Sequence, residues 1–214
     1  EISWLDAETY EKHPQAVNEL GQFDGIIVPG GFGARGVDGK MNVIRYCREK
    51  QIPYFGLCYG LQLAVVEFAR HVCGLQDAHT TEVKEDTPYP VIDTMPEQLV
   101  NIREHRLGGS MRLGAYRCEI REKTRSHEAY GTTKISERHR HRYEVNNDFR
   151  AKLEDAGMVF SGINPDRNLV EIIELPNHPF FVGTQFHPEF KSRPIAPHPL
   201  FIAFIRAAIK KECL

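Results

Sequence analysis

The sequence predicts an α/β domain with an open, mainly parallel central sheet and helices on both faces. Two strand–turn–helix units support this prediction, because short apolar segments at 22–29 and 52–57 are each followed by a helical pattern, at 37–50 and 60–72. Strands that alternate with helices are typical of parallel sheets, in which a helix forms the crossover. The length of 214 residues suits one domain with a substantial core, so we expect a single domain over residues 1–214.

The first strand–helix unit is marked by β-branched residues and then by glycines. Residues 26–28 favour a buried strand, and the Pro-Gly-Gly sequence at 29–31 stops it. Apolar residues recur at helical spacing from Val43 onward. Basic residues gather in the last turn of 37–50, where they complement the helix dipole, so we expect the helix to end there.

Later segments complete the expected order of elements. Residues 52–57 are predicted to form a second strand that opens with Pro53, and 60–72 the helix that follows it directly. The remaining expectations are a loop with short strands at 81–93, a mobile glycine-containing loop at 107–114, a helix at 147–156, strands at 169–175 and 180–185, and a last helix with an apolar stripe at 200–210.

Composition and charge exclude several classes of protein. Hydrophobic residues make up 41% and charged residues 26% of the chain, which is typical of globular domains and not of disordered or coiled-coil proteins. A formal net charge of -2 gives no general attraction for nucleic acid or for an anionic membrane, and the apolar runs are too short to span a bilayer. The chain starts at Glu1 without a signal-peptide pattern, which suggests a fragment or a trimmed chain.

The five cysteines are scattered along the chain, which favours free thiols in a reducing, cytoplasmic compartment. They form no Cys-x-x-Cys pair, so we expect no metal site. A small buried side chain without chemistry is the ordinary expectation for Cys47, Cys73 and Cys118. Cys58 differs from them because of the residues that surround it.

Cys58 is the central residue of Gly56-Leu57-Cys58-Tyr59-Gly60, the pattern of a nucleophile elbow between a strand and a helix. A nucleophile on such a sharp turn is raised above the sheet in a strained conformation, and glycines two residues away avoid collisions. The following helix favours a thiolate with its N-terminus, and the N–H of Tyr59 is placed to stabilise an oxyanion. A five-residue pattern occurs often by chance, so the assignment needs a partner base.

His187 is the best candidate for that base among ten histidines. It follows the apolar strand at 180–185, at the edge where α/β sheets carry functional loops. Glu189 is close enough in sequence to orient the imidazole, as triad mechanisms require. The alternative is a surface turn with an incidental His-Pro-Glu sequence. His178 and His198 also lie next to prolines but lack a close acidic partner.

The glycines that follow Val28 suggest a second contribution to the same site. Glycine allows backbone N–H groups to face a ligand, so Gly31 is a candidate for the second oxyanion donor. A phosphate-binding loop is the alternative for this segment. It is disfavoured because the Lys-Ser/Thr of a P-loop and the full G-x-G-x-x-G pattern are both missing from 28–33.

Residues 138–142 alternate arginine and histidine. On a strand, this alternation would put the three arginines on one face and the two histidines on the other. One basic face in a net-acidic chain suits a small anionic ligand, such as a carboxylate, better than a nucleic-acid duplex. A solvated, charged strand is the alternative, and the two histidines by themselves make a poor metal site.

Three of these motifs together resemble the class I (triad-type) glutamine amidotransferases. They are PGGFG at 29–33, GLCYGLQ at 56–62 and GTQFHPEF at 183–190. Further stretches narrow the resemblance to the amidotransferase domain of the CTP synthase family, and it covers essentially the whole chain. These stretches are LAVVEFAR at 63–70, GGSMRLG at 108–114, ERHRHRYEVN at 137–146 and VEIIELPNHPFFVGTQFHPEF at 170–190.

The resemblance implies a catalytic role for each matching residue. Cys58, His187 and Glu189 match the catalytic triad of the family. Gly31 and Tyr59 match the residues whose N–H groups form the oxyanion hole. The activity implied is hydrolysis of L-glutamine to glutamate and ammonia through a cysteine thioester.

The resemblance also implies ligands and partners. Gln62, Glu82 and Arg142 match positions that hold the amino and carboxylate ends of L-glutamine, and a guanidinium suits a carboxylate through its paired donors. Arg112 falls in a loop that the family places near a GTP effector and the ammonia exit. No cofactor is implied for this domain. ATP and Mg²⁺ would bind a separate synthetase domain that aminates UTP, and the full-length enzyme is expected to be a homotetramer.

The sequence departs from the family pattern at three points. Judged by the resemblance, we expect this sequence to lack the synthetase domain and a first strand and helix ahead of Glu1, and the loss of a strand would expose a sheet edge. Tyr59 stands where the family often has Leu, which makes the pocket wall more polar and leaves the backbone donor unchanged. The rival hypotheses are an amidotransferase of another pathway, a γ-glutamyl hydrolase with the same elbow, and a non-catalytic binding module.

Overall fold

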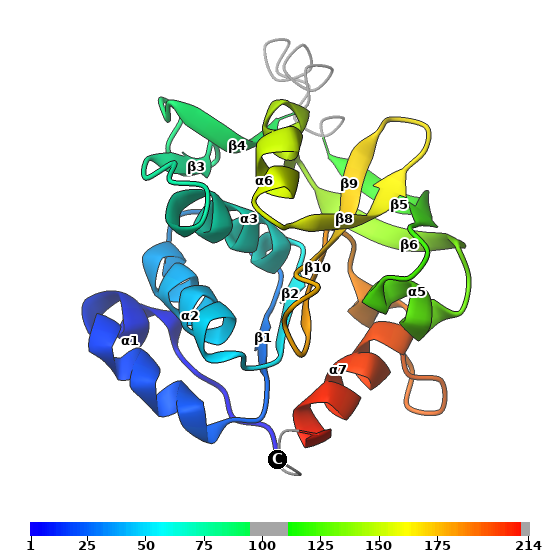
Figure 1. The fold of residues 1–214 in the computed structure, drawn as a ribbon, viewed down its shortest axis with the longest axis horizontal. Helices are drawn as coiled ribbons and strands as arrows, with labels where there is room; N and C mark the ends of the chain where they lie inside the picture. The colour runs from blue at the N-terminus through cyan, green and yellow to red at the C-terminus, as the bar shows by residue number, and fades with distance from the viewer. Residues whose placement is uncertain (95–110, 211–214) are drawn as a thin grey trace.

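The computed structural model describes residues 1–94 and 111–210, which form a central sheet flanked by helices (Figure 1). Within the described residues, a seven-stranded sheet has the order β1-β2-β10-β9-β8-β5-β6. Its strands are β1 (Ile26–Val28), β2 (Tyr54–Leu57), β5 (Arg112–Ile120), β6 (Lys134–His141), β8 (Val159–Asn164), β9 (Leu169–Glu174) and β10 (Phe181–Thr184).

The sheet is mixed, so the expectation of a mainly parallel sheet is wrong. Strands β1, β2 and β10 run parallel, with β2 in the middle. From β10 onward, each neighbouring pair through β9, β8, β5 and β6 is antiparallel. The connections explain the difference. Residues 175–180, which join β9 to β10, allow a turn but not a parallel crossover, which needs about a dozen residues or more.

Helices cover both faces of the sheet, as the sequence predicts (Figure 1). One face carries α1 (Ala7–Lys12), the 3-10 helix η1 (Pro14–Gln22), α2 (Val37–Lys50) and α3 (Tyr59–His71), and the other carries α5 (Arg125–Tyr130) and α7 (Pro199–Lys210). A hydrophobic core lies on each face of the sheet. In the core beside α2 and α3, Tyr54 stacks on Phe181, with ring centroids 4.5 Å apart. The next residue, Phe55, packs against Phe204 of α7 in the core on the opposite face. Consecutive residues of β2 thus face opposite cores.

The local predictions are most accurate in the two strand–helix units. Helix α2 has the predicted bounds, and β2 and α3 differ from their predicted bounds by one or two residues. The predicted helix at 147–156 is a 3-10 turn, η3 (Asn147–Phe149), followed by α6 (Arg150–Asp155). The expected loop at 107–114 is wrong from residue 112 onward, where β5 begins; residues 107–110 lie outside the described part.

A second sheet of three strands packs on α3 and carries two of the predicted site residues. It consists of β3 (Ala78–Thr80), β4 (Tyr89–Thr94) and β7 (Tyr143–Val145), in that order. Glu82 lies just after β3, and Arg142 lies between β6 and β7. Within residues 1–94 and 111–210, the helices are all too short or too polar to cross a membrane.

Candidate active site

Cys58 lies at a strained turn between β2 and α3. Its backbone has φ 48° and ψ -94°, and such a positive φ is rare for a residue with a Cβ. Its N–H donates to the carbonyl oxygen of Thr184 in β10, 2.6 Å away, which ties the turn to the neighbouring strand. The thiol is therefore held at the C-terminal end of the parallel strands, where α/β folds carry their functional loops.

The two glycines of the elbow are required by close packing. A Cβ on Gly56 would lie 2.6 Å from the hydroxyl of Tyr54. A Cβ on Gly60 would lie 2.3 Å from the carbonyl oxygen of Val28 in β1. Both distances are too short for a real Cβ, so a side chain at either position would push the strands and α3 apart. The pattern that predicted the elbow thus has a physical cause in this chain.

His187 is held by three contacts that leave one ring nitrogen unused. Its Nδ1 lies 2.6 Å from Oε1 of Glu189, its backbone N–H donates to the carbonyl of Arg138, and its ring stacks on Phe190. A carboxylate accepts hydrogen bonds, so Nδ1 carries the proton and Nε2 has the lone pair. Nε2 is buried and has no hydrogen-bond partner among the described residues. This nitrogen is therefore able to accept a proton.

Cys58 and His187 both lie next to Gly30. A Cβ on Gly30 would lie 2.9 Å from Cε1 of His187 and 3.7 Å from Cβ of Cys58. A side chain at this position would collide with the imidazole ring and contact the Cβ of Cys58. Sequence reasoning assigned a role to Gly31 and missed Gly30, although both belong to the same Pro-Gly-Gly signal.

The surroundings of Cys58 favour its neutral thiol. Burial and, to a smaller extent, the carboxylates of Glu144 and Glu189 together raise the pKa of Cys58 to about 12. A hydrogen bond from the backbone of Tyr59 acts against them and lowers it. The thiol therefore needs a base before it can attack, because only the thiolate is nucleophilic.

Gln185 contacts the thiol directly, and sequence reasoning missed it. Its Nε2 donates to Sγ of Cys58 at 3.6 Å, and its Oε1 accepts from Nε2 of Gln62 at 3.3 Å. Gln62 also donates to the carbonyl of Tyr143, 2.8 Å away. The predicted site residue Gln62 is thus buried in a network behind the sulfur. The signal for Gln185 was its place next to Phe186-His187 in the motif at 183–190.

Glu82 reaches the glycine segment from the other side. Its Oε1 accepts from the N–H of Gly33 at 2.9 Å, and the carbonyl of Gly33 accepts from the hydroxyl of Tyr59 at 2.6 Å. Burial raises the pKa of Glu82, whereas the Gly33 N–H and the charge of Arg142 lower it. The structure therefore brings Gly31, Tyr59, Glu82 and Arg142 to one side of the elbow.

Arg112 does not lie in an exposed loop. It is the first residue of β5 and is 2% exposed. Its guanidinium donates to Glu171 at 2.5 Å and to Glu144 at 3.4 Å. The expectation of a loop arginine is wrong because two buried carboxylates, distant in sequence, pair with the charge inside the protein.

The predicted alternation is confirmed for residues 138–141 of β6, but Arg142 does not share the face of the other two arginines. Arg138 and Arg140 are exposed, and His139 and His141 are buried. The exposed face borders a hollow of about 790 Å³ that is also lined by Phe190 and by Arg193. Arg142 follows the end of the strand and is half-buried, near Glu82 rather than on this face.

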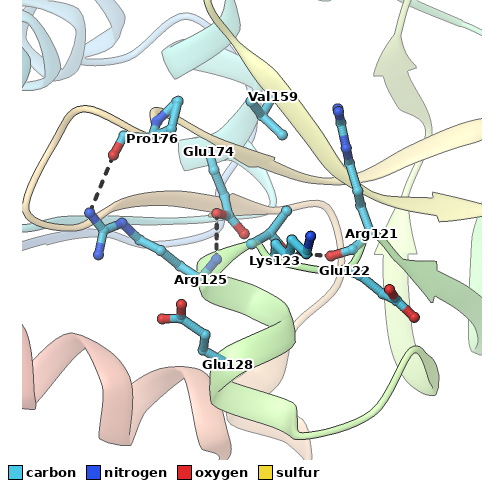
Figure 2. A pocket seen from close by; sticks show the side chains of 9 residues that line it. Arg121, Glu122, Lys123, Arg125, Glu128, Val159, Glu174 and Pro176 are labelled. Carbon is cyan, nitrogen blue, oxygen red and sulfur yellow. Dashed lines mark hydrogen bonds between the residues drawn. The ribbon is translucent and has the colours of Figure 1, made fainter.

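A second hollow, of about 430 Å³, lies at the start of α5, and Figure 2 shows its lining side chains. None of the predicted site residues lines it. Glu174, which projects into this region, accepts hydrogen bonds from the N–H groups of Arg125 and Ser126 and so caps α5. No group of three or more histidine, cysteine or carboxylate side chains in the described part of the chain could hold a metal ion.

Comparisons with known proteins agree with this arrangement. The sequence model of the family "Glutamine amidotransferase class-I" matches residues 2–207. The CTP synthase of Carboxydothermus hydrogenoformans is 56% identical over 213 residues, which are 100% of this chain and 39% of that relative. The CTP synthase of Thermococcus kodakarensis is also 56% identical over 213 residues, 99% of this chain and 39% of that protein.

A solved structure matches over nearly the whole chain. The glutaminase domain of Trypanosoma brucei CTPS with bound acivicin has a TM-score of 0.91 and 38% identity, and the match covers 98% of this chain and 81% of that one. The chain spans about two fifths of the length of the curated relatives, 39% of the first two named above. It belongs to the class I glutamine amidotransferase family, and within that family to the glutaminase domains of CTP synthases.

Proposed function

We propose that Cys58, His187 and Glu189 are the catalytic triad with which this glutaminase domain hydrolyses L-glutamine to glutamate and ammonia. The observation that carries the proposal is that Cys58 and His187 both lie within 4 Å of the position that a Cβ on Gly30 would take. The thiol lies on a strained elbow, and the imidazole has one nitrogen bound by Glu189 and the other unused. A nucleophile, a base and an orienting acid in this order form the general triad arrangement.

The first step is formation of a thioester. Nε2 of His187 takes the proton of the Cys58 thiol, and the sulfur attacks the side-chain carbonyl carbon of glutamine. The N–H groups of Tyr59 and Gly31 stabilise the resulting oxyanion. The backbone N–H of Tyr59 already donates a hydrogen bond to Cys58, and this bond lowers the pKa of the thiol. His187 returns the proton to the nitrogen, the carbon–nitrogen bond breaks, and ammonia leaves.

The second step releases glutamate. His187 Nε2 removes a proton from a water molecule, which attacks the thioester carbonyl carbon. The same two N–H groups stabilise the second oxyanion. The carbon–sulfur bond then breaks, the proton passes to the sulfur, and Cys58 is regenerated as a thiol. Protonated Nδ1 remains bonded to Glu189 throughout, which keeps the imidazole in the tautomer that both steps need.

Glu82 and Arg142 are proposed to hold the two charged ends of glutamine. Glu82 uses one carboxylate oxygen for the Gly33 N–H, and its other oxygen is suited to the substrate ammonium. Arg142 offers paired donors for the substrate carboxylate. Replacing Arg142 by Lys should raise KM for glutamine by about 10-fold, because a lysine cannot form the paired bonds. Arg140→Lys, on the exposed face of β6, is the matched control and should leave KM unchanged.

The activity of the whole protein is a further proposal. Residues 1–214 would form the amidotransferase domain of a CTP synthase, and the ammonia would pass to a synthetase domain that converts UTP to CTP with ATP and Mg²⁺. We propose GTP as its allosteric effector and a homotetramer as the cytoplasmic enzyme. This proposal is supported by the similarity to CTP synthases over nearly the full length of this chain.

Substitution of the nucleophile tests the proposal. In the full-length protein, Cys58→Ser should reduce glutamine hydrolysis by more than about 10³-fold and leave ammonia-dependent CTP formation intact. The matched control is Cys73→Ser, which replaces a half-buried thiol outside the site and should retain both activities. Loss of both activities in the Cys58 variant would contradict the assignment.

Covalent labelling separates an active domain from a non-catalytic module. The glutamine-analogue electrophile diazo-oxo-norleucine should add to Cys58 in the wild-type protein, as located by peptide mass spectrometry. Absence of the adduct would favour a binding module without turnover. Ammonia-dependent formation of a product other than CTP would instead favour an amidotransferase of another pathway.

A further inference from the structure

The side chain of Tyr59 spans the glycine segment that follows β1. Tyr59 is the first residue of α3, next to the nucleophile, and is 1% exposed. Its hydroxyl donates to the carbonyl oxygen of Gly33 at 2.6 Å. Its ring lies beside Gly31, where a Cβ would be 3.4 Å from Cδ1 of the tyrosine. One side chain therefore contacts the segment at two points, on both sides of Phe32.

Gly33 is bound at its other polar group as well. Its N–H donates to Oε1 of Glu82 at 2.9 Å. The two backbone groups of Gly33 are thus held by side chains from two different elements, α3 and the turn after β3. Its φ of +73° suits glycine, and a Cβ there would contact nothing within 4 Å, so packing alone does not hold it.

Next to Gly33 the segment is exposed, although Gly30 packs closely against the ring of His187. Gly31 is exposed, and 85% of the Phe32 side chain is exposed to solvent. An exposed glycine-rich segment has much conformational freedom to lose, and a hydrogen-bond donor that stabilises an oxyanion must be placed before the reaction begins. The two bonds to Gly33 therefore restrain the segment on the far side of Phe32 and help to fix the position of the Gly31 N–H.

We propose that the hydroxyl of Tyr59 is a positioning group for catalysis: it anchors the segment at 29–33, through Gly33, so that the Gly31 N–H points into the oxyanion hole. This inference rests on the proposed function of Gly31. It concerns the side chain of Tyr59, whereas the proposed catalytic contact of the same residue is its backbone N–H. The variant Tyr59→Phe distinguishes the two contributions, because it removes the hydroxyl and keeps the backbone N–H and the ring.

The protonation of Tyr59 suits this role. Burial and, to a smaller extent, the Glu82 carboxylate raise the pKa of the Tyr59 hydroxyl above its usual value. The hydroxyl therefore remains a donor at every pH at which the enzyme would work. The ammonium of Lys40 lies over the face of the same ring, 5.7 Å from its centroid, and adds a contact that Tyr59→Phe would preserve.

Glu82 connects the anchor to substrate binding. The same carboxylate holds the Gly33 N–H and is proposed to receive the ammonium of glutamine. Glu82→Gln keeps an oxygen that can accept from Gly33 but removes the charge that would attract the ammonium. The two variants should therefore affect different kinetic constants, because Tyr59 acts on the placement of the donor and Glu82 acts on substrate binding as well.

The test compares Tyr59→Phe, Glu82→Gln and wild type in the full-length protein. Tyr59→Phe should lower kcat for glutamine hydrolysis by about 10-fold, less than the 10²–10³-fold typical of losing an oxyanion donor, and leave KM nearly unchanged. Glu82→Gln should mainly raise KM. Tyr46→Phe, which removes a hydroxyl bonded to the carbonyl of Asn18, is the control and should change neither constant. Ammonia-dependent synthesis should be the same in all four proteins.

Hydrogen exchange provides a readout that does not depend on turnover. Amide hydrogens in the peptide that contains 29–33 should exchange about 10-fold faster in Tyr59→Phe than in wild type or Tyr46→Phe. Unchanged exchange in this peptide would overturn the anchor, whatever the activity. Faster exchange with wild-type kcat would overturn its role in catalysis. A wild-type protein that neither hydrolyses glutamine nor labels at Cys58 would instead overturn the proposed function, and the exchange result would still decide the anchor.

Discussion

Nδ1 of His187 lies 2.6 Å from Oε1 of Glu189, while Nε2 of the same ring is buried without a hydrogen-bond partner among the described residues. The ring is therefore oriented on one side and available for proton transfer on the other. Because the Glu189 side chain is 39% exposed, water can replace part of what it provides. The orientation of the His187 ring and the exposure of Glu189 together set how strongly the proposed activity should depend on the Glu189 carboxylate.

Glu189→Gln should lower kcat for glutamine hydrolysis by about 100-fold. Removing the charge of a fully buried triad acid costs about 10⁴-fold in kcat, and the exposure of Glu189 reduces the effect. Steady-state hydrolysis of glutamine measures it, with KM expected to stay near wild type. The control is Glu49→Gln, which removes a carboxylate of similar exposure, 44%, from an ion pair with Arg45 and should leave kcat unchanged. A wild-type kcat in Glu189→Gln would mean that another group orients the imidazole.

Alkylation of Cys58 should depend steeply on pH in the absence of glutamine. Burial, then the Glu144 and Glu189 carboxylates, raise the pKa of its thiol to about 12, so the thiol is protonated at neutral pH. The thiolate fraction then grows about 10-fold per pH unit up to that value. Iodoacetamide labelling, followed at Cys58 by mass spectrometry, should accelerate by this factor from about pH 7 to 10 without a plateau. A plateau below pH 8 would reveal a preformed thiolate–imidazolium pair.

The two carboxylates around Arg112 should respond differently to loss of charge. Burial raises the pKa of Glu144 to about 8 and that of Glu171 to about 7, and Glu171 lies closer to the guanidinium. One positive charge faces two carboxylates, so we expect Glu144 to hold a proton at neutral pH. Glu144→Gln should then cost less than about 1 kcal/mol of unfolding free energy, whereas Glu171→Gln should cost about 3–5 kcal/mol, because it leaves a buried guanidinium without its partner. Urea denaturation at pH 7 measures both.

The pH dependence of the same variant gives an independent check. The pKa of Glu144 is raised in the folded chain from 4.5 to about 8, so its proton stabilises the folded state below pH 4.5 and this contribution is lost as pH rises through about 8. In the variant Glu144→Gln, the side chain at this position cannot ionise, so the variant does not lose this stability as pH rises. The variant should therefore gain stability relative to wild type as pH rises from 5 to 8, by at most about 1.4 kcal/mol per pH unit. A constant difference would contradict the assignment of the proton.

Gly60→Ala should destabilise the fold far more than Gly31→Ala. A Cβ on Gly60 would lie 2.3 Å from a backbone oxygen of Val28, and backbone atoms of a strand cannot move aside without breaking the sheet. A Cβ on Gly31 would have its nearest contact at 3.4 Å, on the ring of Tyr59. We expect a loss of about 3 kcal/mol or more for Gly60→Ala, or no folded protein, and less than about 1 kcal/mol for Gly31→Ala. Equal stabilities would contradict the packing argument.

The elbow around Cys58 could be predicted from sequence because its causes are local. A strand, a turn and a helix follow one another within a few residues, and the collisions that demand Gly56 and Gly60 arise within that unit and its neighbouring strand. The same holds for α2, whose bounds agree with the prediction. The pairing of His187 with Glu189 could also be predicted, because the two residues are only two positions apart in the sequence.

Arg112 could not be placed in this way. Its local sequence, GGSMRLG, suggests an exposed loop, and its burial depends on Glu144 and Glu171, which are 32 and 59 residues away. A charged side chain is buried only where distant partners satisfy it, and no local pattern reports such partners. Gln185 was overlooked for a similar reason, since its contact with Cys58 spans 127 residues.

The sequence by itself determined the strand–turn–helix units, the elbow at Cys58 and the residues of the proposed triad, because hydrophobic periodicity, glycine positions and neighbouring residues act over short distances. Only the tertiary structure decided the direction of the strands from β9 to β6, the buried pairing of Arg112 and the anchoring of Gly33 between Tyr59 and Glu82. These features depend on which distant segments pair with one another, and that choice is made by the packing of the whole chain rather than by any one of its segments.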